Sequence, residues 1–320
     1  MGVKVSQIAF RHATDTNYRG RMDAQVLTSL AYTAITRAED ALANLVGTYT
    51  AFQLVSISSI FTAMRSTHHN IRAMLNEGEN NPGSVDSLAF ARIQIESLYA
   101  ICLMLEGPDY VNMYMRDGWG KGYVQFLLQR EETKDLARFH EFNTTAPQKL
   151  AMARDFVGVT AAQQATLDFE QLGTPLPAGV TETPIPQFPT PGKTIRKITI
   201  AERKHMLQRL YPEYTRLCSF AHVLPESMFF KTLFNRNHEI RNLISLSNIK
   251  DRFQQDIAEA GFIISFISMV QSAAELTTLY PTDLNLKAAA VEALTKLIDD
   301  SLLGRVIWEI RSRALLGIIA

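Results

Sequence analysis

Apolar residues recur three or four positions apart along most of this chain, which is the spacing that places them on one face of an α-helix. The pattern predicts a first helix between Asp23 and Val46, with Gly47 separating it from a second helix that runs towards Glu77. Further helices are expected at about 108–131, 134–142, 146–158 and 160–172, and again from Ile200 to the end, with breaks at Pro212, Pro225 and Pro281.

One predicted helix differs from the others because it is apolar nearly all round. It follows the turn at Asn80–Gly83 and ends before Gly107 and Pro108. A helix without a wide polar face is normally surrounded by other elements, so we expect it at the centre of the fold.

Prolines are concentrated in one segment. Between Gly173 and Lys193 lie six of the twelve prolines, which excludes a regular helix there and favours a long extended loop. Thr194–Thr199 could at most form a short edge strand beside it. The sequence therefore predicts an all-α, multi-helix bundle with a long Pro-rich insertion loop. Residues 1–172 would form its N-terminal part, 173–199 the loop or linker, and 200–320 a C-terminal helical part packed on the first.

Composition narrows the classes of partner and compartment. Lys plus Arg equals Asp plus Glu at 32 each, so no overall charge attracts a polyanion or an anionic membrane, and a specific site would be needed. The two cysteines fall in predicted helices, and no signal peptide is recognisable, which favours a cytoplasmic protein. Ala41–Met64 lacks charged residues, but polar side chains interrupt it. We therefore expect a buried bundle helix there and no membrane span.

Metal and cofactor motifs are missing from the sequence. It has no Gly-rich phosphate loop and no cysteine pair at zinc spacing, and Glu202 with His205 forms only a single Glu-x-x-His. His68 and His69 point about 100° apart on a helix, so we interpret them as a solvated helix end. We expect neither a cofactor nor a metal ion.

Two polar groups lie within apolar helices. Arg92 and Glu96 are one turn apart in the central helix, where an ion pair would be partly buried and would either fix the packing or support a polar site. In the helix predicted from Tyr214, the residues Thr215, Ser219 and His222 share a face, with Arg216 at its border. This face predicts a polar groove or a capped helix end with His222 satisfying terminal carbonyls.

The segment Arg216-Leu-Cys-Ser-Phe-Ala-His222 resembles the Arg-x4-6-His pattern of the HEPN superfamily, which consists of all-α proteins. The order Ala91-Arg92-Ile-Gln-Ile-Glu96 followed by Tyr214 to His222 is similar to an uncharacterised bacterial HEPN-like family. The resemblance implies a dimeric, metal-independent ribonuclease acting in antiphage defence or a toxin–antitoxin system. His222 would handle a proton and Arg216 would bind the scissile phosphate of RNA. Ser219, Thr215, Arg92 and Glu96 would support them.

A second function remains open. A helical protein without catalytic activity could use the same polar groove to bind a nucleotide or a partner, as a binding or scaffold protein. The Pro-rich loop and the apolar C-terminus, Leu315–Ala320, would then contact a protein partner or a second copy of the chain.

Overall fold

The computed structural model describes residues 24–42, 45, 47–76, 86–221 and 247–277. Helices make up 83% of this interpretable part, and no strand occurs in it, so the prediction of an all-α multi-helix fold is confirmed. The chain forms two compact units. We call residues 1–106 with 191–320 the bundle unit and residues 107–190 the inserted unit, because the second interrupts the sequence of the first.

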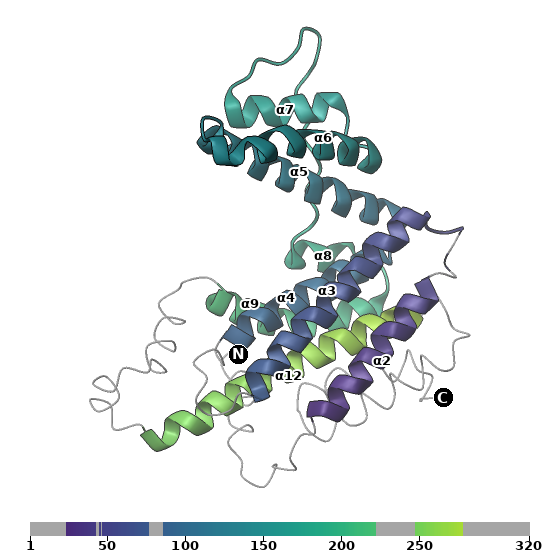
Figure 1. The fold of residues 1–320 in the computed structure, drawn as a ribbon. Helices are drawn as coiled ribbons and strands as arrows, with labels where there is room; N and C mark the ends of the chain where they lie inside the picture. Colours follow the sequence, from purple (N-terminus) through teal and green to yellow (C-terminus); the bar gives the residue numbers. More distant parts are fainter. Residues whose placement is uncertain (1–23, 43–44, 46, 77–85, 222–246, 278–320) are drawn as a thin grey trace. The chain divides into compact units, whose positions relative to one another are not determined.

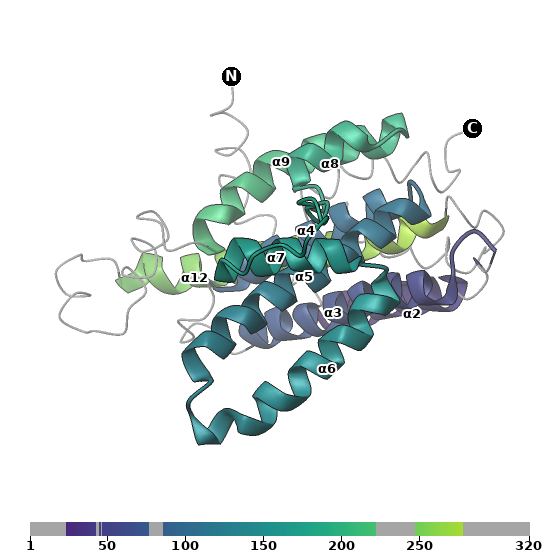
Figure 2. The ribbon, with the colours of Figure 1, turned by 90° about the horizontal axis from the view of Figure 1, so that it is seen from above.

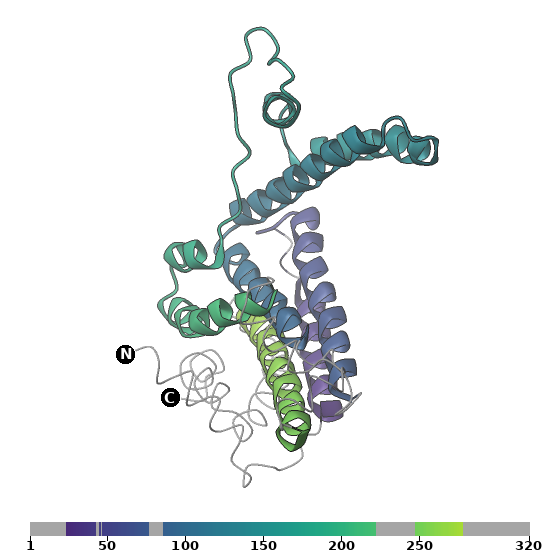
Figure 3. The same ribbon diagram turned by 90° about the vertical axis from the view of Figure 1, so that its left-hand side faces the viewer.

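The bundle unit is organised around α4. Figure 1 shows its helices, and Figure 3 shows α8 and α9 on the side of α4 opposite α2. Contacts join α4 to α3, α8, α9 and α12, while α12 also packs on α2 and α3. The helices are α2 (Ala24–Leu42), α3 (Ala51–Asn76), α4 (Asp86–Met104), α8 (Pro191–Lys197), α9 (Ala201–Ala221) and α12 (Ser247–Thr277).

The central place of α4 follows from its composition. Buried residues occur on all its sides, among them Leu88, Ile95, Leu98 and Ile101, as the sequence predicted for a helix without a polar face. By length and composition α4 is also a candidate membrane span, but 67% of it is buried, and core helices pass the same test. The uncharged stretch 41–64 is divided between the end of α2 and the start of α3.

The inserted unit consists of three α-helices and one short 3₁₀ turn. They are α5 (Pro108–Thr133), η5 (Ala137–Phe139), α6 (His140–Val157) and α7 (Ala161–Leu172), with α6 and α7 both packed against α5 (Figure 2). Its small core includes Trp119 and Tyr123, whose rings stack with centroids 4.9 Å apart. The unit therefore has a core of its own.

Local signals set the ends of these helices. Thr160 and Gln163 form a capping box at the start of α7, which confirms Thr160 as the predicted start. Gly158 and Gly173 end α6 and α7 in the left-handed conformation, with φ of 70° and 67°, where glycine is least strained.

Residues 173–190 contain neither helix nor strand. Part of this stretch packs on the inserted unit: the Thr183 N–H donates to the Thr166 hydroxyl at 2.8 Å, and the Phe188 ring meets Tyr114 edge to face at 5.0 Å. The prediction of a short edge strand at Thr194–Thr199 is wrong, because α8 occupies Pro191–Lys197. Proline is well tolerated at the first position of a helix, where its missing N–H would have no partner.

The sequence predicted that Pro212 ends a helix, but Pro212 lies inside α9, which continues to Ala221. The proline removes one helical hydrogen bond, a cost that packing on both sides offsets. Leu207 and Leu210 before it, and Leu217 and Phe220 after it, are all buried. Apolar burial along the whole helix explains why α9 continues.

Candidate functional site

The two helices that carry the predicted polar residues meet. α4 packs against α9, and the buried Tyr99 hydroxyl of α4 donates to the backbone carbonyl of Leu207 on α9. The structure thus places Arg92 and Glu96 on a helix in direct contact with the helix of Thr215, Arg216 and Ser219.

Three side chains form a polar cluster at this contact. Arg92 Nη2 donates to Glu96 Oε1 at 2.8 Å, and the Tyr214 hydroxyl donates to the same oxygen at 3.0 Å. The Arg92 guanidinium also lies over the Tyr214 ring, 5.7 Å from its centroid. We call Arg92, Glu96 and Tyr214 the α4–α9 cluster. Arg92 and Glu96 are 19% and 35% exposed, so solvent reaches it.

The protonation states of the cluster follow from burial and from the neighbouring charges. Burial raises the pKa of the Tyr214 hydroxyl to about 12, so Tyr214 keeps its proton at neutral pH. Burial alone lowers the pKa of Arg92, but the Tyr214 hydroxyl and the Glu96 carboxylate raise it above its usual value. The cluster therefore presents a permanent cation beside a neutral phenol.

A ligand could reach Arg92 only where its side chain meets solvent, and this side chain is 19% exposed. Its Nε has no hydrogen-bond partner within the described part of the chain, but it is buried and therefore closed to a ligand. A guanidinium carries five N–H donors in a planar fork, which suits the oxygens of a phosphate or a carboxylate. An anion arriving at the exposed edge of Arg92 could share the guanidinium with Glu96.

Arg216 is not part of this cluster. Its Nε and Nη2 donate to the carboxylate of Glu213, one turn earlier on α9, at 2.9 and 2.8 Å. Arg216 is two positions after Tyr214, which corresponds to about 200° around a helix and therefore to the opposite side of α9. Thr215 is exposed, and its hydroxyl donates to the Tyr211 carbonyl at 3.0 Å.

The remaining predicted residues cannot be placed in the same way. Ser219 belongs to α9, but its side chain is outside what the structure describes. His222 lies outside the described residues, and so does the apolar C-terminus from Leu315 to Ala320. The proposed pairing of Arg216 with His222 stays a prediction.

Tyr214 is the member of the cluster to which sequence reasoning gave no role. It stood at the start of the segment compared with the HEPN pattern, and a signal for it was present. Tyr214 is one turn after Leu210 and one turn before Leu217, so it falls on the buried side of α9.

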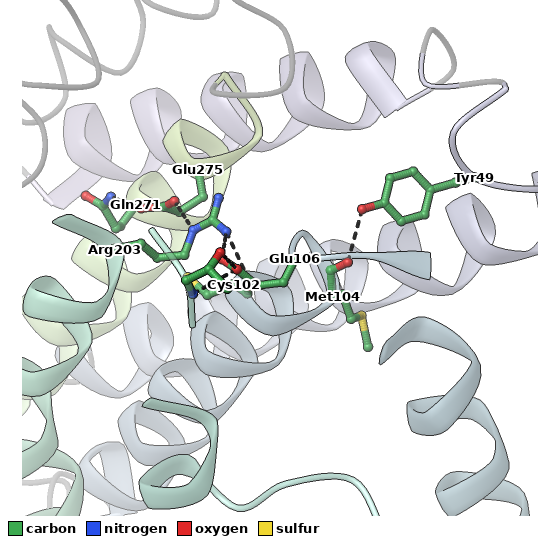
Figure 4. A network of polar contacts seen from close by, with 8 residues as sticks. Tyr49, Cys102, Met104, Glu106, Arg203, Gln271 and Glu275 are labelled. Atoms are coloured by element: carbon green, nitrogen blue, oxygen red, sulfur yellow. Dashed lines mark hydrogen bonds and ion pairs between the residues drawn. The ribbon is translucent and has the colours of Figure 1, made fainter. Parts of the chain in front are cut away.

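A second polar cluster, which the sequence did not predict, lies inside the bundle unit, and only its Glu106 is partly accessible to solvent (Figure 4). Arg203 of α9 lies between two carboxylates. Its Nε donates to Glu275 Oε2 of α12 at 2.7 Å, and its Nη1 donates to Glu106 and to the Cys102 carbonyl. Gln271 donates to the other oxygen of Glu275 at 2.9 Å. This cluster ties α4, α9 and α12 together.

The charge of Arg203 is maintained by its partners. Burial alone lowers the pKa of this guanidinium, but Glu275 and Glu106 raise it above its usual value. Glu106 also accepts the backbone N–H of Thr199 at 2.9 Å. The available signal was the position of Arg203 one turn before Met206 and Leu207, in the apolar stripe of α9.

The interpretation of His68 as part of a solvated helix end is wrong. His68 is fully buried in the bundle unit, whereas its neighbour His69 is exposed. The His68 Nδ1 lies 2.7 Å from the Ser265 hydroxyl, its Nε2 lies 3.3 Å from the Thr28 hydroxyl, and its ring packs on Phe262 at 4.8 Å. His68 therefore joins α2, α3 and α12 from inside.

Among the described residues, no group of three His, Cys, Asp or Glu side chains is arranged to hold a metal ion.

Comparisons with protein-family models, curated proteins and solved structures gave no match to this chain.

Proposed function

We propose that this chain is a HEPN-like protein that binds RNA at the α4–α9 cluster and cleaves it without a metal ion. One observation carries the proposal: α4 and α9 meet at Arg92, Glu96 and Tyr214, so a partly exposed guanidinium lies on the helix pair that also carries Arg216 and Ser219. A positioned guanidinium can bind a phosphate and offset the charge that develops on it.

The chemistry would be an internal attack on the RNA backbone. The ribose 2′-oxygen would form a bond to phosphorus while the bond to the 5′-oxygen of the next nucleotide breaks. His222 would take the proton from the 2′-hydroxyl or give one to the leaving oxygen. The products would be a 2′,3′-cyclic phosphate and a free 5′-hydroxyl. No metal is needed, because the guanidinium of Arg92 supplies the positive charge.

The setting of this activity is part of the same proposal. The resemblance to HEPN proteins favours a cytoplasmic ribonuclease that acts as a dimer in defence against phage or in a toxin–antitoxin system. Two copies of the site in one dimer would act on the same RNA.

A second candidate, a binding or scaffold protein without catalytic activity, is favoured by the contacts of Arg216. Its guanidinium is paired with Glu213, in a partly buried ion pair on the side of α9 away from Tyr214. In that case the α4–α9 cluster would bind an anionic partner without cleaving it.

The two candidates differ in what happens to RNA. Purified protein should be incubated with end-labelled RNA and a chelator, and the ends of the products analysed. The ribonuclease should release 2′,3′-cyclic phosphate ends, and His222→Ala should lower the rate by about 10²-fold or more. His140→Ala, at an exposed histidine of α6, is the matched control and should leave the rate unchanged.

The outcomes separate cleanly. Cleavage that survives His222→Ala would overturn the assignment of His222. RNA that is bound but stays intact would favour the scaffold protein. RNA that is neither bound nor cut would overturn the ribonuclease and would exclude RNA as the partner of the scaffold protein.

A further inference from the structure

We propose that Tyr211 is the base-binding residue of this site and that the substrate class is single-stranded RNA, one unpaired base of which stacks on the Tyr211 ring. This inference rests on the proposed function, because it assumes that the α4–α9 cluster binds the RNA backbone. It adds a residue and a strand preference that the cluster alone does not define.

Tyr211 lies near the α4–α9 cluster. It lies one turn before Tyr214 on α9, with ring centroids 6.0 Å apart and an angle of 33° between the rings. Tyr214 in turn contacts Arg92 and Glu96. The Tyr211 ring is thus next to Tyr214, which contacts the guanidinium that would hold a phosphate.

The Tyr211 side chain is exposed to solvent. Tyr211 is 39% exposed, whereas most large apolar and aromatic side chains of the described bundle helices are buried. Aromatic side chains beside a cation are the usual combination by which proteins hold single strands, because every base has a face that can stack.

The Tyr211 ring is held in place by α8. A Cβ added at Gly192 of α8 would lie 3.0 Å from the Tyr211 hydroxyl oxygen, so the hydroxyl end of the ring rests against the α8 backbone. A fixed ring loses little conformational freedom when a base stacks on it. In a duplex, each base is already stacked on its neighbours and cannot reach the ring.

A preference for single strands over duplexes would distinguish stacking on Tyr211 from general electrostatic attraction of a polyanion. The chain has equal numbers of acidic and basic residues, so a duplex gains no general electrostatic advantage. Binding should therefore depend on the local pairing of one guanidinium with one aromatic ring.

The test measures binding apart from cleavage. The probe is a fluorescein-labelled 2′-O-methyl RNA of about eight nucleotides, a length within the range of single-strand sites, which cannot form a cyclic phosphate. Its affinity for the full chain is measured by anisotropy in the presence of a chelator. The same strand annealed to its complement provides the duplex arm.

Tyr211→Leu should weaken binding of the single strand about tenfold, while Tyr211→Phe should stay within about twofold of the wild type. Phe156→Ala is the matched control, because Phe156 is an aromatic residue of α6 that is 66% exposed. It should leave the affinity unchanged. An abasic nucleotide placed at the stacked position should weaken wild-type binding by the same factor and should have no effect on Tyr211→Leu.

Equal affinity of wild type and Tyr211→Leu, or duplex binding as tight as single-strand binding, would overturn the assignment. The phenylalanine variant guards against a folding defect, because it keeps the ring and the packing. RNA cut by wild type and by Tyr211→Leu at the same rate, with unchanged affinity, would refute this inference alone. A stacking effect with intact RNA would refute only the ribonuclease.

Discussion

Arg203 Nε and Glu275 Oε2 are 2.7 Å apart, and neither side chain is exposed to solvent. A charge inside a protein is tolerated only when its partners replace the water it has lost. Arg203 of α9 has such partners on α4, in the turn that follows α4 and on α12, so the bundle unit depends on a polar centre as well as on its apolar core.

Removing one charge from this centre should therefore be costly. Glu275→Gln leaves Arg203 with one buried carboxylate fewer, and we expect the free energy of unfolding to fall by about 3–5 kcal/mol. Urea denaturation measures the change. Glu39→Gln is the control, since the Arg65–Glu39 pair is 35% and 21% exposed and should contribute about 1 kcal/mol or less. Equal losses in both variants would contradict the role of burial.

His68 should make the protein sensitive to acid. Burial lowers its pKa from 6.5 to about 3, so the unfolded chain binds a proton at a pH where the folded chain does not. The stability that depends on neutral His68 is present above pH 6.5 and is lost as the pH falls towards 3. The slope should approach about 1.4 kcal/mol per pH unit.

This slope can be assigned to His68 by substitution. His68→Gln cannot take up the proton, so its free energy of unfolding should vary less with pH between 6.5 and 4, even if the variant is less stable at neutral pH. Urea denaturation at several pH values gives both curves. Parallel curves would show that another group causes the acid sensitivity.

Gly261 should resist substitution because of its closeness to α4. A Cβ added there would lie 2.5 Å from the Ser87 hydroxyl oxygen and 3.1 Å from the Ser87 backbone carbon, so α12 would have to move away from α4. We expect Gly261→Ala to destabilise the protein by about 1–3 kcal/mol. A Cβ at Gly122 of α5 meets nothing within 4 Å, and Gly122→Ala should instead add up to about 1 kcal/mol. Thermal unfolding distinguishes the two signs.

The α4–α9 cluster should behave as an energetic unit. Tyr214→Leu removes the hydrogen bond to Glu96 and the ring under Arg92 and should cost about 1 kcal/mol of stability or more. Arg92→Met should cost less when Leu already replaces Tyr214, because the contact of the guanidinium with the ring is then already lost. A double-mutant cycle measured by urea denaturation gives the coupling. Additive effects would mean that Arg92 and Tyr214 do not support one another.

The fold class was predictable because it depends on local patterns. Helical spacing of apolar residues identified most of the helices, although α6 is one helix where two were expected and α8 was not predicted. The unbroken apolar character of α4 gave its central place. Pro212 was misinterpreted because burial of residues such as Leu217, far along the helix, decides whether α9 continues. Local rules for proline contain no such information.

The candidate site was predictable only in part. Arg92 and Glu96 were found because they are one turn apart on one helix. The contribution of Tyr214 depends on how α9 packs against α4, which spacing along the chain does not give. For the same reason no role was assigned to Arg203 from the sequence, because its partners Glu106 and Glu275 are far away along the chain.

The interruption of the bundle unit by residues 107–190 has a consequence for synthesis. A ribosome releases the inserted unit as one continuous stretch, so its helices can pack as soon as they emerge. The bundle unit must wait, because α4 is translated early while its neighbours α9 and α12 come after the insertion. Until then, among the helices that pack on α4, only α3 has been made, and a chaperone that shields apolar surfaces would act during this interval.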